Sequence, residues 1–346
     1  MSPLIWSMLL MSLATSTIIT MSSYHWLLAW LALELNTLSI LPIIIKPHHP
    51  RATESTVKYF MIQTTAAAMI LFASTLNTWQ TGQWSITYSP TLISTLIITT
   101  AIMLKLGLVP VHTWYPEVLQ GATLYTALIL STWQKIAPLA LLFLMSPHLP
   151  NNMLMITGLL SALLGGWAGM NQTQTRKIMA FSSIAHMGWL MVALSLNQTL
   201  ATLTLIIYIM MTTTIFSSMA TTNTKTLTDI TTIWTHSPAL MTMMMLTLMS
   251  LGGLPPLTGF MPKWLILKDL TYWKLNIMAL SLLMASLPSL FFYIRMAYLT
   301  ILTTPPITAC AKYKWRLNTN FNSNLMLLTM SATLLLPMMP ILYNTM

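Results

Sequence analysis

The chain has 346 residues, of which 55% are hydrophobic and only 6% are charged. A soluble domain usually carries about 25% charged residues because its surface faces water, so this composition excludes a water-soluble globule. The formal net charge of +10 comes from basic residues scattered between apolar segments, which argues against nucleic-acid binding. The single cysteine, Cys310, excludes an internal disulfide and a cysteine-ligated iron–sulfur cluster in this chain.

Apolar segments of transmembrane length follow one another along the chain. A helix of roughly 20 residues crosses a hydrocarbon core of ~30 Å, so the sequence predicts an all-α polytopic membrane protein of about eleven spans in one transmembrane domain, 1–346. The predicted spans are 3–20, 26–45, 59–78, 91–111, 122–145, 151–170, 178–196, 199–220, 237–272, 275–297 and 324–343. The N-terminus lacks the patterns of a signal or transit peptide, so the first apolar run predicts a retained span.

Two of these segments contain helix breakers. Residues 237–272 are too long for one straight crossing and contain a cluster of glycines and prolines between Gly252 and Gly259, which predicts two half-helices. Leu106-Gly-Leu-Val-Pro110 resembles Leu251-Gly-Gly-Leu-Pro255, five spans later. A second copy of a five-helix repeat would enter the membrane from the opposite side, because five is an odd number of crossings, so the two copies would have inverted topology. Interrupted helices at matching positions of such copies indicate a transport site. The match is short, and chance is the alternative explanation.

The connecting segments differ in charge on the two sides of the membrane. The N-terminal side holds nine basic residues, Lys46, Arg51, Lys58, Arg176, Lys177, Lys225, Lys312, Lys314 and Arg316, whereas the other side holds Lys268 and Lys274. Basic loops stay in the compartment where the chain is made. The N-terminus is therefore expected there, and an odd number of spans puts the C-terminus opposite.

Four ionisable residues fall inside predicted spans: Glu34, Lys105, Lys135 and Lys263. A charge at mid-membrane costs at least ~2.5–3.5 kcal/mol, which pairing, water or neutralisation must offset. One interpretation is that these residues form ion pairs that fix helix packing. The other is a proton relay, because three lysines and one glutamate do not pair evenly and two lysines adjoin helix breaks, where freed backbone groups attract water.

The two lysines at the breaks are expected to differ in electrostatic surroundings. Lys105 is close to the C-terminal end of a half-helix, where the helix dipole favours a cation. Lys263 is close to the N-terminal start of the next half-helix, where a cation is disfavoured. We therefore expect different proton affinities at the two positions.

Two histidines are further candidates for the relay. His112 follows the first break and His186 lies between small and polar residues in the span 178–196. A histidine can pass protons near neutral pH, although His112 can equally be a hydrogen-bonded loop residue. The adjacent His48 and His49 lack further metal ligands nearby, and no dinucleotide or P-loop motif occurs, so the sequence predicts no metal and no cofactor in this chain.

Four segments together resemble a known family, and the resemblance runs in order over nearly the whole chain. They are 105–118 (KLGLVPVHTWYPEV), 132–138 (TWQKIAP), 171–188 (NQTQTRKIMAFSSIAHMG) and 251–264 (LGGLPPLTGFMPKW). They are similar to the chain 2 family of mitochondrial NADH–ubiquinone oxidoreductase (respiratory complex I), in its mammalian form. The resemblance implies an antiporter-like subunit with inverted repeats at 1–145 and 151–300 and a final helix at 324–343.

The resemblance also implies a role for each intramembrane charge and a set of partners. Glu34 and Lys105 look like the family's glutamate–lysine pair, Lys135 like its connecting lysine and Lys263 like its terminal lysine. The implied activity is proton translocation across the mitochondrial inner membrane by a proton-translocating NADH:ubiquinone reductase, with the N-terminus in the matrix and the C-terminus in the intermembrane space. NADH, FMN, iron–sulfur clusters and ubiquinone would belong to partner subunits.

Expected neighbours are other membrane-arm and accessory subunits and membrane lipids, including cardiolipin. The charged spans and broken helices also suit a self-contained cation/proton antiporter, which is the alternative function. A non-transporting membrane scaffold is a third reading, but a scaffold has no need for lysines at two helix breaks.

Overall fold

The computed structural model describes residues 3–88, 90–236, 238–302, 323–338, 340, 341 and 343. Within these ranges the regular structure is helical, apart from isolated bridges between short extended segments. Eight described helical segments are long and apolar enough to cross a membrane, one of them the run Leu124–His148, and three shorter helices are also apolar. The predicted all-α polytopic fold is therefore confirmed.

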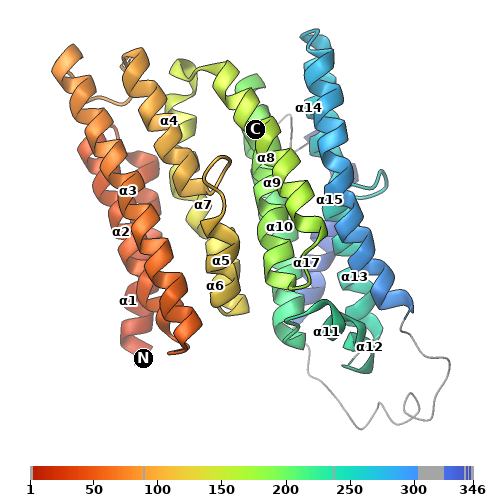
Figure 1. Ribbon diagram of the computed structural model, residues 1–346. Coiled ribbons are helices and arrows are strands. Elements are labelled where there is room, and N and C mark those ends of the chain that lie inside the picture. The colour runs from red at the N-terminus through yellow and green to blue at the C-terminus, as the bar shows by residue number, and fades with distance from the viewer. Residues whose placement is uncertain are drawn as a thin grey trace. The chain divides into compact units, whose positions relative to one another are not determined.

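The chain divides into two compact units, Met1–Ser161 and Ala162–Met346. The first unit contains α1 (Pro3–Ser22), α2 (Trp26–Ile45), α3 (Pro50–Thr81), α4 (Leu92–Leu106), α5 (Trp114–Gly121), α6 (Leu124–Ser131), α7 (Trp133–Met145) and η1 (Ser146–His148). Helices α1, α2 and α3 pack side by side in chain order, and α3 also packs against α4 and α5 (Figure 1). The break after α4 therefore lies against a long neighbouring helix.

Local sequence explains where the helices of this unit begin and end. Helix α3 starts nine residues before the predicted span, because the His49 side chain accepts a hydrogen bond from the Arg51 amide and Pro50 occupies the first helical turn. Arg51 and Lys58 therefore lie in a helix, not in the loop expected for them. The predicted span 122–145 is divided at Thr132, whose hydroxyl donates a hydrogen bond to the Leu128 carbonyl.

The second unit is built around α10. The described helices that follow α7 are α8 (Asn151–Met170), which contains the boundary between the units, α9 (Thr175–Leu196), α10 (Gln198–Thr222), α11 (Leu227–Thr231), α12 (Ile233–His236), α13 (Pro238–Gly252), α14 (Phe260–Tyr272), α15 (Asn276–Leu302), α17 (Ser323–Leu334) and η3 (Leu336–Met338). Helix α10 packs against α9, α13, α14 and α17. Lys312, Lys314, Arg316, Cys310 and part of the predicted span 324–343 lie outside the described residues.

The predicted break in segment 237–272 is present between α13 and α14. Helix α13 ends where Gly253 takes a φ of +82°, a conformation that L side chains rarely adopt. The chain then folds back until Gly259 lies against the end of α13, where a Cβ added to Gly259 would be only 1.8 Å from the Ser250 carbonyl oxygen. The absence of a side chain at Gly259 is what lets the break close.

The short helix α11 begins with a reciprocal cap. The Asp229 carboxylate accepts hydrogen bonds from the amides of Lys225 and Thr226, both at 2.8 Å, and the Thr226 hydroxyl accepts one from the Asp229 amide. These backbone hydrogen bonds hold the pKa of the Asp229 carboxyl below its usual value. The cap fixes the connection between α10 and α13.

Replacing Gly259 by alanine is expected to destabilise the second unit by about 3 kcal/mol or more, because the new methyl group overlaps backbone that cannot move aside. Gly252→Ala is the matched control, since a Cβ there meets nothing closer than 3.8 Å. The melting temperature of each variant, measured on the detergent-solubilised full-length protein, reports the stability of both variants. Equal melting temperatures for the two variants would show that the break tolerates a side chain at Gly259.

Asp229→Ala is expected to weaken the start of α11 by about 1 kcal/mol, because two backbone donors lose their acceptor. Since the folded pKa of Asp229 is depressed, its contribution is present above the unfolded pKa and is lost as pH falls through the folded pKa. Hydrogen exchange of the α11 amides measures the effect. Asp229→Asn keeps an acceptor without the charge, so its exchange should lose this acid dependence; an unchanged acid dependence would contradict the assignment.

Candidate functional site

Lys105 and Lys135 line one cavity in the first unit. The space between its lining residues is about 390 Å³, part of which is open to the outside, and it is bounded by α2 to α7. Its lining residues are Leu33, Asn36, Thr37, Tyr59, Gln63, Lys105, Leu106, Trp114, Tyr115, Leu130, Gln134, Lys135 and Pro138. Both lysine side chains belong to residues that are at least nine-tenths buried, with 7% of Lys105 and 3% of Lys135 exposed. The structure thus brings together two of the lysines that the sequence singles out.

Lys105 lies in the last turn of α4, immediately before the break. The helix ends at Gly107, whose φ of +71° lets its amide bond back to the Leu104 carbonyl. The Lys105 carbonyl accepts a hydrogen bond of 3.3 Å from the Gln63 amide nitrogen on α3. The predicted location of Lys105 at the C-terminal end of a half-helix is therefore confirmed. This end of a helix favours a cation.

Glu34 lies on α2 and follows Leu33, which lines the cavity together with Lys105. Among the described protein atoms, neither Glu34 Oε2 nor Lys105 Nζ has a hydrogen-bond partner. The same holds for the indole nitrogen of Trp114, which lines the cavity with Lys105. Buried polar atoms without a protein partner usually bond to water, so this cavity has the polar lining that an internal water cluster needs.

Lys135 lies in the first turn of α7, and its Nζ is 4.9 Å from the centroid of the Tyr115 ring. The rings of Tyr115 and Trp114 meet edge to face at 5.5 Å, and Trp114 lies 5.9 Å from the Tyr59 ring. An aromatic face attracts a cation, more strongly where water is excluded. The Lys135 ammonium therefore has an aromatic contact from α5.

A chain of polar side chains crosses the same cavity. The Gln134 amide nitrogen donates to the Asn36 side-chain oxygen at 3.1 Å, and the Tyr59 hydroxyl donates to the Gln134 oxygen at 3.4 Å. None of these residues, nor Gln63, is among the site residues that the sequence predicts. The signal was available, because Tyr59 and Gln63 are one helical turn apart in an apolar segment, and Asn36 and Gln134 adjoin the predicted charges.

Another cavity, in the second unit, contains Lys263 and His186. The space between its lining residues is about 330 Å³, part of which is open to the outside. It is lined by His186, Trp189, Thr204, Ile207, Tyr208, Met211, Gly259, Pro262, Lys263 and Ile266. His186 Nε2 is 3.4 Å from the Tyr293 hydroxyl, and its ring lies 5.9 Å from that of Tyr208. The two candidates of this unit therefore line one cavity that also contains a buried phenol.

The electrostatic expectation for Lys263 is wrong. Lys263 lies in the first turn of α14, as predicted, but its side chain reaches back and Nζ donates a 3.0 Å hydrogen bond to the Gly252 carbonyl. Gly252 is the last residue of α13, so the ammonium meets the C-terminal end of one half-helix, the end that favours a cation. The position of Lys263 in the sequence predicted its place on α14, but it did not predict where the ammonium group at the end of its side chain lies.

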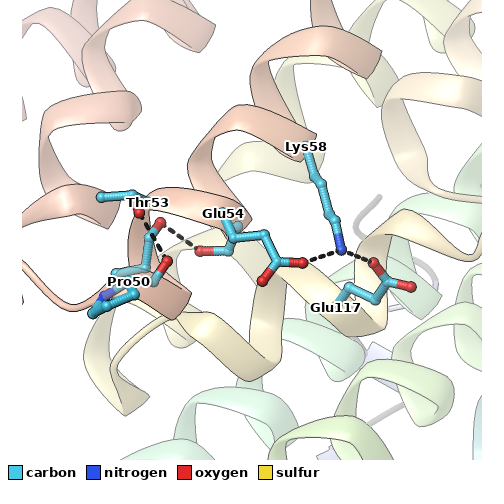
Figure 2. Close-up of polar contacts among 7 residues, drawn as sticks. Pro50, Thr53, Glu54, Lys58 and Glu117 are labelled. Atoms are coloured by element: carbon cyan, nitrogen blue, oxygen red, sulfur yellow. Dashed lines mark hydrogen bonds and ion pairs between the residues drawn. The ribbon is translucent and has the colours of Figure 1, made fainter.

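His112 and Glu117 lie apart from the lining of these cavities. His112 lies in the break after α4, where Nδ1 is 3.3 Å from the Pro110 carbonyl oxygen. The Lys58 ammonium on α3 contacts two carboxylates at 2.6 Å each (Figure 2). One belongs to Glu117 on α5, and the other to Glu54, which precedes Lys58 on α3 by one helical turn. Lys58 was expected only as a basic residue in a loop, whereas its side chain joins α3 to α5 at an exposed site.

The described residues contain no group of three or more histidine, cysteine or acidic side chains that could hold a metal ion. His49 instead caps α3. The cavities combine amines, phenols and an imidazole, which exchange protons, with amides and indole groups that orient neighbours. The chemistry that these groups can perform is proton binding and release.

Comparison with known proteins gives consistent results over the chain. A family model described as "NADH:quinone oxidoreductase/Mrp antiporter, TM" matches residues 23–289, and one described as "NADH dehydrogenase subunit 2 C-terminus" matches residues 290–343. NADH-ubiquinone oxidoreductase chain 2 of Gallus gallus is 51% identical over 331 residues, covering 96% of each chain. The protein of the same name from Salmo salar is 51% identical over 341 residues, covering 98% of each.

Solved structures share the fold. A chain of respiratory complex I from Thermus thermophilus superimposes with a TM-score of 0.80 at 24% identity, covering 95% of this chain and 78% of that one. A chain of the Mrp complex from Dietzia gives a TM-score of 0.78 at 15% identity, covering 86% and 61%. These likenesses concern the fold, whereas the near-full-length relatives at about half identity decide the family. The chain belongs to the NADH-ubiquinone oxidoreductase chain 2 family.

Proposed function

We propose that this chain is a membrane-arm subunit of respiratory complex I and takes part in proton translocation driven by NADH oxidation and ubiquinone reduction in partner subunits. The observation that carries the proposal is the cavity lined by both Lys105 and Lys135 in a chain of this family. Two amines that line one polar cavity can exchange protons through water in that cavity. A purely structural subunit does not require that arrangement.

The proposed relay begins with Glu34 and Lys105 and continues to Lys135. Glu34 Oε2 and Lys105 Nζ have no hydrogen-bond partner among the described protein atoms, so no direct hydrogen bond joins these two atoms. In the proposed relay, a change in their separation alters how strongly the carboxylate stabilises the charged lysine. In the second unit, Lys263 and His186 share a cavity and are the proposed continuation. His112, at the break, is proposed only as a proton-accepting group outside the cavity lining.

We propose further that residues 1–145 and 151–300 are two inverted five-helix repeats, followed by a final helix at 324–343. Support comes from the two breaks, where a glycine with positive φ ends a helix, Gly107 after α4 and Gly253 after α13. In each case a lysine side chain belongs to a cavity beside the break. Matching broken helices are typical of transporters whose site lies near mid-membrane.

The proposed setting is the mitochondrial inner membrane, with the N-terminus in the matrix and the C-terminus in the intermembrane space. Complex I subunits of the membrane arm, accessory subunits and lipids including cardiolipin are the proposed neighbours. NADH, FMN, iron–sulfur clusters and ubiquinone are assigned to partner subunits. The contribution of this chain is to hold and move protons at its own amines and carboxylate.

A self-contained cation/proton antiporter remains the second candidate. The Mrp chain shares the fold at 15% identity, which is too distant to transfer its activity. Relatives at 51% identity carry the oxidoreductase name instead. The observations therefore favour the complex I subunit.

Lys105→Met in the intact complex is expected to lower the proton-pumping NADH:ubiquinone rate by about tenfold, equivalent to ~1.4 kcal/mol, because the amine of the relay is lost. The measurement is NADH oxidation together with acidification of resealed inside-out particles. Lys268→Met, which removes an exposed lysine, is the control and should retain the parent rate. Full pumping by an assembled Lys105→Met complex would remove Lys105 from the proposed relay.

The proposed orientation predicts opposite labelling of two exposed lysines, Lys46 and Lys274. A membrane-impermeant amine reagent added to mitoplasts should modify Lys274 and leave Lys46 unmodified, and inside-out particles should give the reverse pattern. Peptide mass spectrometry measures both sites in one sample. Modification of both lysines from one side would contradict the orientation.

A further inference from the structure

The side chain of Tyr115 connects the break after α4 with the ammonium of Lys135. Tyr115 lies in the first turn of α5 and is 3% exposed. Its ring centroid is 4.9 Å from Lys135 Nζ. At its other end, a Cβ added to Gly107 would lie 3.1 Å from the Tyr115 Cβ, so the backbone of the break packs directly on this residue. Gly107 follows Lys105 by two residues.

Neighbouring aromatic rings hold Tyr115 in position. Trp114 meets its ring edge to face at an interplanar angle of 88°, and Trp114 is in turn tilted against Tyr59 of α3. An edge-to-face contact restricts ring rotation as well as position. The ring face that Lys135 meets is therefore set by α3 and by the break, two elements outside the helix that carries Lys135.

The strength of a cation–π contact depends on the cation lying over the ring face within about 6 Å of its centroid, and it increases when water is excluded. At 4.9 Å the Lys135 ammonium is inside this range. A displacement of the ring away from Lys135 by about 1 Å would bring the ammonium to the limit of this range. The charged form of Lys135 then gains or loses stabilisation, whereas the neutral amine is affected little.

We infer that Tyr115 is a positioning residue that makes the proton occupancy of Lys135 depend on the conformation of the break next to Lys105. The inference rests on the proposed function, since Lys135 must be a proton carrier for its occupancy to affect pumping. It assigns the effect to the aromatic face. The hydroxyl group of Tyr115 is dispensable for it.

The test uses the intact complex with Tyr115→Phe, which keeps the ring face, and Tyr115→Met, which keeps much of the volume without it. The phenylalanine variant is expected to pump within about 1.5-fold of the parent rate, and the methionine variant about threefold more slowly. Tyr125→Met removes a tyrosine that is 62% exposed and should change nothing. Equal pumping by the Tyr115→Phe and Tyr115→Met complexes would overturn the inference.

A double-mutant cycle separates this role from simple packing. If Tyr115 acts through the Lys135 charge, Tyr115→Met should lower the residual rate no further in a Lys135→Met background. A further threefold loss in that background would overturn the inference. If the Tyr115→Met complex fails to assemble, removing the buried charge with Lys135→Met should restore assembly, because the ammonium that the aromatic face stabilised is then gone; failure to restore it also overturns the inference.

The two proposals fail in different ways. Full pumping by Lys105→Met and Lys135→Met complexes would refute the proposed function itself. Reduced pumping in both lysine variants, together with equal rates for the two Tyr115 variants, would leave that function standing and remove only the role of the aromatic face.

Discussion

The structure depends on one constraint: in hydrocarbon, an ammonium or a freed backbone group needs a polar partner, which other protein groups or internal water must supply. The interrupted helices are where this constraint is met. At Gly107 and at Gly253 a glycine with positive φ ends a helix, and a lysine is associated with each interrupted end. Lys263 donates directly to the Gly252 carbonyl, whereas Lys105 occupies the last turn of α4. Both positions exploit the negative end of a helix dipole.

The lysines nevertheless receive different kinds of support. Lys263 donates to a backbone carbonyl, Lys135 meets an aromatic ring, and Lys105 Nζ has no hydrogen-bond partner among the described protein atoms. A fixed ion pair favours one charge state and so resists change. For the proposed relay, the absence of such a fixed pair at Lys105 Nζ within the described part of the chain is suitable, because this group would have to gain and lose protons.

The cavities are small and belong to the packing of each unit. In the first unit, Gln134 and Asn36 join α7 to α2, and Tyr59 joins α3 to the same pair. These amides do not exchange protons readily, but their hydrogen bonds hold the helices around Lys105 and Lys135 together. Outside the cavity, Lys58 between Glu54 and Glu117 joins α3 to α5 (Figure 2). The helices that line the cavity are therefore joined to one another by polar side chains.

The amino-acid sequence was enough to predict the membrane fold, most helix positions and the broken segment between α13 and α14. It also identified the charges inside the spans. Hydropathy, glycine and proline positions, and a lysine within an apolar span are all local signals. The sequence misjudged the start of α3, the division at Thr132 and the surroundings of Lys263. Three contacts became visible only in the folded chain. Lys105 and Lys135 line the same cavity, the Tyr115 ring faces Lys135, and the Lys263 side chain reaches the Gly252 carbonyl. The physical reason is that long side chains and residues distant in sequence meet through helix packing, which no local pattern specifies.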